Sequence, residues 1–187
     1  MLILASASPR RQELLQQIGC EFRVVVSNAA EISGDEFSPE RVAVENARRK
    51  AEEVASREKG GAAVLGADTV VAVDGEILGK PKDEADAARM LRLLSGRQHF
   101  VYTGVALVYQ GNVFEDVVRT AVWVDTLSEE EIAAYIATGE PMDKAGAYAV
   151  QGKAAQFIPR IDGSFSNVVG LPLHAVKDLS RKAGIIL

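Results

Sequence analysis

The chain has 187 residues, of which 48% are hydrophobic and 25% are charged, as is ordinary for a globular protein that folds around its own core. The formal net charge of −5 argues against nucleic acid as a partner, because no large positive field is available to attract a phosphate backbone. A single cysteine, Cys20, excludes an intramolecular disulfide, and nothing in the composition indicates an oxidising compartment.

The first residues, MLILASASPRR, lack both the basic leader and the long apolar core of a secretory signal peptide. No apolar run in the sequence approaches the roughly 20 residues that a membrane-spanning helix needs. We therefore expect a cytoplasmic protein with no membrane partner.

The first predicted elements are a short buried strand over residues 2–5 and a helix that begins at Pro9. Ser8 is placed to cap this helix and Gly19 to end it, because serine accepts hydrogen bonds from free helix amides and glycine adopts a left-handed conformation easily. Ser38 and Pro39 repeat the same start signal, and apolar residues at helical spacing follow them.

Residues 62–81 contain two apolar, β-branched runs around Asp74-Gly75, a pair that is typical of a tight hairpin turn. A helix is predicted over residues 85–94, and a second hairpin over residues 100–123. Ser128 and Glu131 then form a capping-box pattern that opens a helix ending near Gly139. The following segment is rich in glycine and polar residues, and a last helix begins near Leu171-Pro172.

Strands alternate with helices along the chain, yet the hairpins require antiparallel pairing, and a mixed sheet satisfies both conditions. The predicted fold class is therefore α/β, with a mixed twisted β-sheet flanked by helices. No internal repeat, low-complexity tract or linker divides the sequence, so we expect residues 1–187 to form a single domain.

Several common catalytic motifs are missing from the sequence. The segment from Gly75 to Pro81 has one spacer residue too few for a P-loop and ends in proline instead of serine or threonine. His99 and His174 are far apart in the chain, and no Cys/His cluster has the spacing of a zinc site. The sequence has no G-x-S-x-G elbow, so a serine hydrolase has little support.

An anion site is indicated where the first strand meets the first helix. Ser8, Arg10 and Arg11 lie at this junction, and the free amides and dipole of a helix N-terminus favour an anion. Arginine adds a planar fork that suits phosphate oxygens. The alternative is a capped helix with two solvated arginines.

Asp68 interrupts the otherwise apolar strand VLGADTVVAV. A buried carboxylate is costly unless it is paired, hydrogen-bonded or bound to a cation, and Gly66 leaves room for a ligand to approach the backbone. We interpret Asp68 and Thr69 as functional residues, with a structural salt bridge from Asp68 to an arginine or lysine as the alternative.

Polar side chains also gather in two glycine-containing segments near the end of the chain. Residues 143–152 include Lys144, Tyr148 and Gln151, and long ordered loops of this composition often line sites. Residues 161–173 carry serine and asparagine side chains that suit hydrogen bonding to a sugar or base, or else an ST-turn that caps the last helix.

Six of these stretches, in order along nearly the whole chain, resemble the Maf family of nucleoside triphosphate pyrophosphatases, also called septum-formation inhibitors. They are LASASPRRQELLQQIG, ENARRKA, GADTVVAVDGEILGKP, TGVAL, MDKAGAYAVQG and GSFSNVVGLPL. The resemblance implies a fold with two lobes around a central cleft, similar to that of inosine-triphosphate pyrophosphatases. It also implies cleavage of a nucleoside triphosphate between its α and β phosphates, dependent on Mg²⁺ or Mn²⁺, and a homodimer.

The resemblance further implies a role for individual residues. Asp68 corresponds to the general base, and Glu31 and Asp68 to metal ligands. The phosphate-contacting positions fall on Ser8, Arg10, Arg11, Lys50 and Lys80. In the branch that prefers dTTP and UTP, which the last two segments resemble, the specificity positions fall on Arg11, Thr69 and Gln151.

Two positions depart from the family pattern. Paired acidic residues are common where this chain reads SNAAEISGDE, so only Glu31 matches, with Asp35 and Glu36 further on. Phe165 stands where tyrosine is more usual.

These observations predict an enzyme in which Asp68 orients and deprotonates a water while basic residues hold the phosphates and Thr69 and Gln151 contact the base. One alternative is a non-catalytic, nucleotide-binding regulator of septum formation. Another is the same chemistry acting mainly on modified pyrimidine nucleotides, such as pseudouridine or 5-methyluridine triphosphates.

Overall fold

The computed structural model describes residues 1–33, 36–58 and 60–187. In chain order the strands and helices are β1 (Leu2–Leu4), α1 (Pro9–Gln17), β2 (Phe22–Val24), α2 (Pro39–Arg57), β3 (Ala63–Val73), β4 (Glu76–Leu78), α3 (Glu84–Leu94), β5 (Gln98–Tyr109), β6 (Asn112–Trp123), α4 (Glu129–Ile136), β7 (Arg160–Asp162), α5 (Phe165–Val169) and α6 (Leu173–Lys182). Three short 3₁₀ helices, η1 (Glu140–Asp143), η2 (Ala145–Ala147) and η3 (Lys153–Phe157), lie between α4 and β7. None of the helices in the described ranges has the length and apolar character needed to cross a membrane.

The strands form one seven-stranded sheet in the order β2-β1-β3-β5-β6-β7, with β4 also paired to β3. β1 runs parallel to β2 and β3, whereas β3, β5, β6 and β7 pair antiparallel along the rest of the sheet. The predicted mixed α/β sheet flanked by helices is therefore confirmed.

Local sequence signals account for most of the element ends. Asp74 and Gly75 both have positive φ, at 50° and 84°, as a type I′ hairpin turn requires. The Ser38 side chain accepts the amide hydrogen of Arg41 at the start of α2, and a full capping box opens α4. Ser8 holds the N-cap position of α1, but its hydroxyl makes no capping hydrogen bond within the described chain, so the predicted side-chain cap is not formed.

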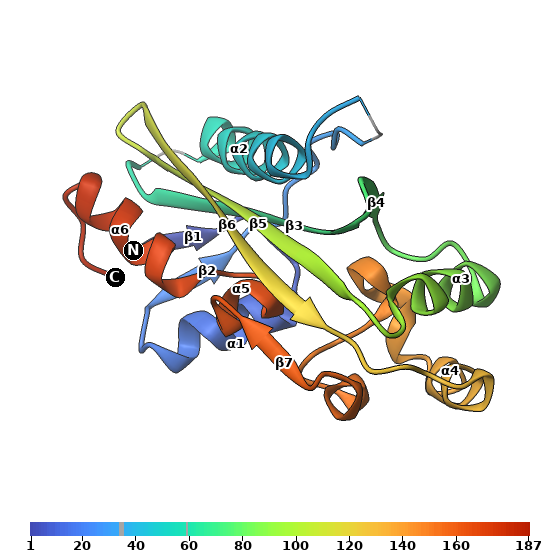
Figure 1. The fold of residues 1–187 in the computed structure, drawn as a ribbon. Helices are drawn as coiled ribbons and strands as arrows, with labels where there is room; N and C mark the ends of the chain where they lie inside the picture. Colours follow the sequence, from blue (N-terminus) through green and yellow to red (C-terminus); the bar gives the residue numbers. More distant parts are fainter. Residues whose placement is uncertain (34–35, 59) are drawn as a thin grey trace.

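α2 covers one face of the sheet, and α1, α5 and α6 lie on the opposite face (Figure 1). α2 approaches β3 and β5 very closely, because glycine occupies the crossing points. A Cβ atom on Gly66 would lie 2.2 Å from the carbonyl oxygen of Ala47, and one on Gly104 would lie 2.3 Å from that of Ala43. The close approach brings the side chains of α2 onto the middle of β3.

β3 is the strand that positions the site, because its edge is uncovered in the middle. β1 pairs with residues 63–65 and β4 with residues 71–73, so among the described residues no strand pairs with residues 66–70 on this side. This gap between β1 and β4 is a window in the sheet. Side chains alternate between the two faces of a strand, so Asp68 points to the face of α2 and Thr69 to the face of α1.

Candidate active site

All the site residues predicted from the sequence line a single cleft of about 810 Å³ that opens at the window between β1 and β4. They are Ser8, Arg10, Arg11, Glu31, Lys50, Asp68, Thr69, Lys80 and Gln151. They come from the β1–α1 junction, the loop after β2, α2, β3, the end of β4 and the segment after η2. Residues far apart in the sequence thus surround one space that is large enough for a nucleotide-sized ligand.

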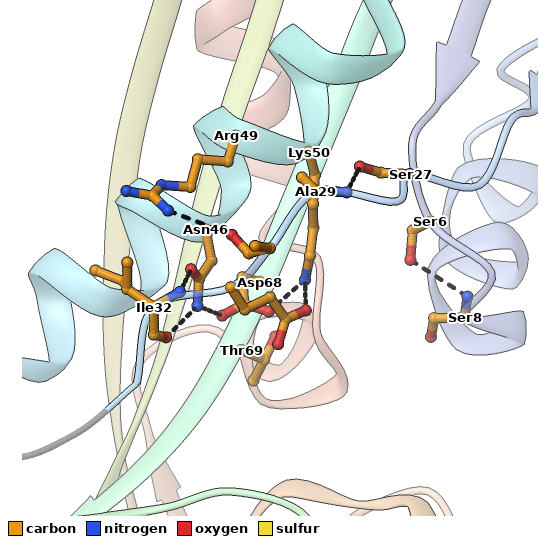
Figure 2. A network of polar contacts seen from close by, with 12 residues as sticks. Ser6, Ser8, Ser27, Ala29, Ile32, Asn46, Arg49, Lys50, Asp68 and Thr69 are labelled. Atoms are coloured by element: carbon orange, nitrogen blue, oxygen red, sulfur yellow. Dashed lines mark hydrogen bonds and ion pairs between the residues drawn. The ribbon is translucent and has the colours of Figure 1, made fainter.

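The carboxylates of Asp68 and Glu31 share the ammonium group of Lys50, and Figure 2 shows the Asp68 and Lys50 side chains pointing toward one another. Lys50 Nζ lies 2.7 Å from Asp68 Oδ1 and 2.6 Å from Glu31 Oε1. The side chains of Asp68 and Lys50 are only 13% and 14% exposed, whereas Glu31 is 56% exposed at the cleft edge. The resemblance implies a phosphate contact for Lys50, but here its charge holds the two acidic side chains together.

Asn46 completes this cluster and was not singled out from the sequence. Its Nδ2 donates to Asp68 Oδ2 at 3.1 Å and to the Ile32 carbonyl at 3.1 Å, and its Oδ1 accepts the Ile32 amide at 2.7 Å. Asn46 therefore ties the loop that carries Glu31 to the carboxylate of Asp68. Its spacing of four residues from Lys50, which places both on one helix face, is the sequence signal that could have identified it.

Arg11 is held entirely by protein groups on the opposite face of β3. Its Nε donates to the Gly170 carbonyl at 2.7 Å, Nη1 to Ser6 Oγ at 3.0 Å and Nη2 to Thr69 Oγ1 at 3.1 Å. Burial lowers the pKa of Arg11, while the charge of Asp68 acts in the opposite direction. Arg11 stays protonated in any case, because an arginine does not lose its proton in a protein. Two of the three predicted specificity positions, Arg11 and Thr69, are thus in direct contact.

Arg10 lies near Asp143, the last residue of η1, which Lys144 follows. Its Nη1 lies 3.8 Å from Asp143 Oδ2, and Asp143 also pairs with Lys144. Burial acts to raise the pKa of Asp143, but the hydrogen bond and charge of Lys144 and the charge of Arg10 outweigh it, so the pKa lies below its usual range. All three residues line the cleft, so the cleft contains two further cations beside the Asp143 carboxylate.

The remaining predicted residues lie at the rim. Lys80 and Gln151 are exposed, and Ser8 is half-buried beside the N-terminus of α1, where its amide donates to Ser6 Oγ at 3.3 Å. All three are accessible to a ligand in the cleft.

Tyr148 forms part of the cleft wall and is fixed from behind by a buried histidine. His99 Nε2 and Tyr148 Oη are 2.7 Å apart, and His99 is 1% exposed. Burial lowers the pKa of His99 from 6.5 to about 4, and it raises the pKa of Tyr148. The histidine is therefore neutral at neutral pH, and the pair positions the segment that contains Gln151.

The serine and asparagine side chains before α6 serve the backbone instead of the cleft. Ser164 Oγ accepts the Asn167 amide at the start of α5, and Ser166 Oγ accepts the Leu173 amide at the start of α6. The serines therefore serve as backbone acceptors, but no ST-turn caps α6: Ser164 caps α5, and Ser166 reaches Leu173 from seven residues earlier in the chain. Neither serine lines the cleft.

The described carboxylates of the cleft offer oxygen ligands for a divalent ion but do not complete its coordination. No group of three or more His, Cys, Asp or Glu side chains converges in the described part of the chain, which leaves out Asp35. Glu31 and Asp68 nevertheless direct oxygens at one point, which Lys50 Nζ marks as a site for positive charge. Mg²⁺ prefers oxygen ligands and is often held by one or two carboxylates plus substrate phosphates and waters. The residues present therefore fit an ion that the substrate helps to bind.

Comparisons with known proteins identify the family of the chain. The model of the family described as "Maf-like protein" matches residues 1–183. The chain is 56% identical to a "dTTP/UTP pyrophosphatase" of Geotalea uraniireducens, over 99% of this chain and 96% of the relative. Proteins of the same name from Dictyoglomus thermophilum and Vibrio cholerae are each 49% identical, over 100% and 97% of this chain and 97% of each relative. A solved "Nucleoside-triphosphatase / dITP/XTP pyrophosphatase" of Mycobacterium abscessus aligns with 66% of this chain and 73% of its own, at 19% identity and a TM-score of 0.41, too distantly to bear on the assignment. The chain belongs to the Maf-like protein family.

Proposed function

We propose that the protein is a nucleoside triphosphate pyrophosphatase that hydrolyses dTTP and UTP to the monophosphate and pyrophosphate. The observation that carries the proposal is the cluster of Asp68, Lys50, Glu31 and Asn46 in the wall of a cleft that also contains arginine and lysine side chains. Full-length relatives that are about half identical and are named dTTP/UTP pyrophosphatase support the same activity and substrates.

Asp68 acts as the general base. Its two oxygens each accept one hydrogen bond, from Lys50 and Asn46, and each keeps a further acceptor position for a water. Asp68 takes a proton from this water as the water oxygen bonds to the α-phosphorus and the bond from that phosphorus to the bridging oxygen breaks. Both donors keep the carboxylate oriented toward the cleft.

Glu31 and Asp68 would hold a divalent ion together with the substrate phosphates, and such an ion, when bound, would neutralise negative charge and lower the pKa of water next to it. The protein contributes the remaining positive charge. Arg10, Lys80 and Lys144 line the cleft and neutralise the charge that develops on the departing pyrophosphate. The amides at the N-terminus of α1 and the hydroxyl of Ser8, which is not used as a helix cap, contact the same phosphates.

The nucleobase of the substrate is recognised on the opposite face of β3 from Asp68. Thr69 and Gln151 line the cleft, and Arg11 holds Thr69 through a hydrogen bond of 3.1 Å. We assign base recognition to Thr69 and Gln151 and a supporting role to Arg11, because its guanidinium is fully engaged with Ser6, Thr69 and Gly170.

Incubation of the purified protein with dTTP or UTP and Mg²⁺ or Mn²⁺, followed by measurement of released pyrophosphate, tests the proposal. Pyrophosphate and monophosphate in equal amounts are expected. Nucleotide binding without release would support the rival role as a non-catalytic regulator of septum formation. Higher kcat/KM values for pseudouridine or 5-methyluridine triphosphate than for UTP and dTTP would make modified nucleotides the main substrates.

We also propose that residues 1–187 act as one domain of two lobes around the cleft, because one sheet contains all seven described strands. We further propose that the protein is cytoplasmic and forms a homodimer. Its substrates are free nucleotides, and neither nucleic acid nor a membrane is a partner. Light scattering of the purified protein measures the oligomeric state, and fractionation of cells measures the compartment.

A further inference from the structure

Thr69 is joined to a buried hydroxyl that no functional assignment above includes. Thr69 on β3 lies directly opposite Thr103 on β5, and their Oγ1 atoms are 2.9 Å apart. Thr103 is 0% exposed, so it cannot touch a ligand in the cleft. Its hydroxyl also lies 3.0 Å from the backbone carbonyl oxygen of Asn167. A chain of hydrogen bonds therefore runs from the cleft to the interior through four groups: Arg11, Thr69, Thr103 and the Asn167 carbonyl.

The two ends of this chain permit only one direction of hydrogen bonding. Arg11 can only donate, so Thr69 Oγ1 accepts from Arg11 Nη2. The Asn167 carbonyl can only accept, so the single hydroxyl hydrogen of Thr103 points at it. Thr103 has no second hydrogen for Thr69, and Thr69 must therefore donate its own hydrogen to Thr103.

The inner end of the chain is firmly held. The carbonyl of Asn167 also accepts the Gly170 amide at 3.0 Å. The Asn167 side chain donates to the Val101 carbonyl at 3.1 Å and to Thr120 Oγ1 at 2.9 Å. The acceptor for Thr103 is thus fixed by β5, β6 and α5 together, and the direction of the chain is built into the fold.

We propose that Thr103 is a positioning residue that makes Thr69 an obligatory hydrogen-bond acceptor toward the substrate base. Thr69 donates inward and accepts from Arg11, so one lone pair is all that it can offer to the cleft. Uracil and thymine have an N–H donor at N3, whereas cytosine has an unprotonated acceptor nitrogen there. A lone pair facing N3 pairs with the first two bases and repels the third. The selection of bases with an N3–H rests on the proposed function, in which Thr69 reads the base.

The test compares kcat/KM for UTP and CTP in Thr103→Val, which keeps the shape of threonine and removes its hydroxyl. Without an inward acceptor, the Thr69 hydroxyl turns and offers its hydrogen to the cleft, where cytosine N3 can accept it. The UTP-to-CTP ratio of kcat/KM is expected to fall at least about tenfold, because a site with the wrong hydrogen-bonding group discriminates strongly. Thr103→Ser, which restores the hydroxyl, should return the ratio to within about threefold of wild type.

Thr120→Val is the matched control, since Thr120 is a buried threonine of the same polar network that contacts Asn167 and Ser164 and not Thr69. Its ratio should stay within about twofold of wild type even where its Tm falls. An unchanged ratio in Thr103→Val, or an equal fall in Thr103→Val and Thr120→Val, would overturn the proposal. Thr103→Ala provides a second variant without the hydroxyl if Thr103→Val does not fold, and the same fall is expected.

Binding of the non-hydrolysable α,β-methylene analogues of UTP and CTP separates this inference from the proposed function. If the wild-type protein releases no pyrophosphate from any nucleotide, the proposed function fails. The ratio of the two Kd values, measured by calorimetry for wild type and Thr103→Val, then decides the role of Thr103 by the same criterion.

Discussion

Lys50 Nζ and Asp68 Oδ1 are 2.7 Å apart, and the two side chains come from a helix and a strand that meet through glycine contacts. The ion pair is the structural salt bridge that was the alternative explanation for a charged residue in an apolar strand. It does not seal the carboxylate away from a ligand, since both residues line the cleft. The pair thus holds Asp68 in place while leaving its oxygens accessible from the window.

Replacing Asp68 by asparagine tests its assignment as the base. The amide keeps the size of the side chain but accepts no proton at neutral pH, so kcat for UTP should fall at least about a hundredfold. Steady-state pyrophosphate release provides the measurement, and circular dichroism checks the fold. Asp162→Asn makes the same chemical change on exposed β7 and should leave kcat unchanged. Near-normal turnover in Asp68→Asn would remove Asp68 from the role.

Lys50→Met tests whether a divalent ion can bind between the carboxylates of Glu31 and Asp68. Without the ammonium, Glu31 and Asp68 repel one another, and the free energy of unfolding should fall by about 2 kcal/mol. Because a divalent ion can take the vacated position, saturating Mg²⁺ should raise the Tm of the variant more than that of wild type. Thermal unfolding with and without Mg²⁺ measures both effects. Lys80→Met removes a cleft lysine at the rim, and its Mg²⁺ shift should match wild type; equal shifts in all three proteins would contradict the metal assignment.

Buried His99 should make stability depend on pH. Its pKa is about 4 in the folded protein and 6.5 as a free side chain, so the unfolded state binds more protons between these values. The free energy of unfolding should therefore fall as pH is lowered from about 6.5 to about 4, by up to about 3 kcal/mol from this residue. Urea unfolding across this range should show a smaller fall in His99→Gln.

His174→Gln is the control for that experiment, because the His174 side chain is 86% exposed on α6. Its pH dependence should match wild type. If His99→Gln and His174→Gln both retain the full fall, groups other than His99 are responsible for it.

Gly104→Ala should disturb stability and activity together. The new Cβ atom would lie 2.3 Å from the backbone of Ala43, so α2 must move away from the sheet. The free energy of unfolding should fall by about 2 kcal/mol or more, and kcat should fall because Asn46 and Lys50 move with the helix. Gly79→Ala, where no atom lies within 4 Å, should change stability by less than about 0.5 kcal/mol. A Gly104→Ala protein with wild-type Tm and kcat would show that the close contact does not position these side chains.

Sequence signals predicted the elements that are defined locally. The turn at Asp74-Gly75, the caps at Ser38 and Ser128, and the helix end at Gly19 depend on residues within one turn of each other. β1 was predicted from its continuous apolar run, but β2 (FRV) and β7 (RID) are equally short and each contains an arginine. They lack that signal and depend on a partner strand elsewhere in the chain.

In the cleft, too, local sequence signals identified individual residues but not the contacts that depend on the tertiary fold. Its residues were found through their positions at strand ends and through the family resemblance, and all of them line one space. Their partners could not be found in this way. The contact of Lys50 with Asp68 depends on how α2 crosses β3, and Thr103 meets Thr69 only through the register of β3 and β5. A threonine in an apolar strand carries no local signal of such a role.

The pleat of β3 has a consequence for engineering. Because neighbouring residues of the strand face opposite layers, the two residues with proposed roles are supported separately. α2 holds the Asp68 carboxylate proposed to react, whereas α1 and α5 hold the Thr69 hydroxyl proposed to contact the nucleobase. Nucleotide preference can therefore be retuned from one layer without rebuilding the reaction centre in the other.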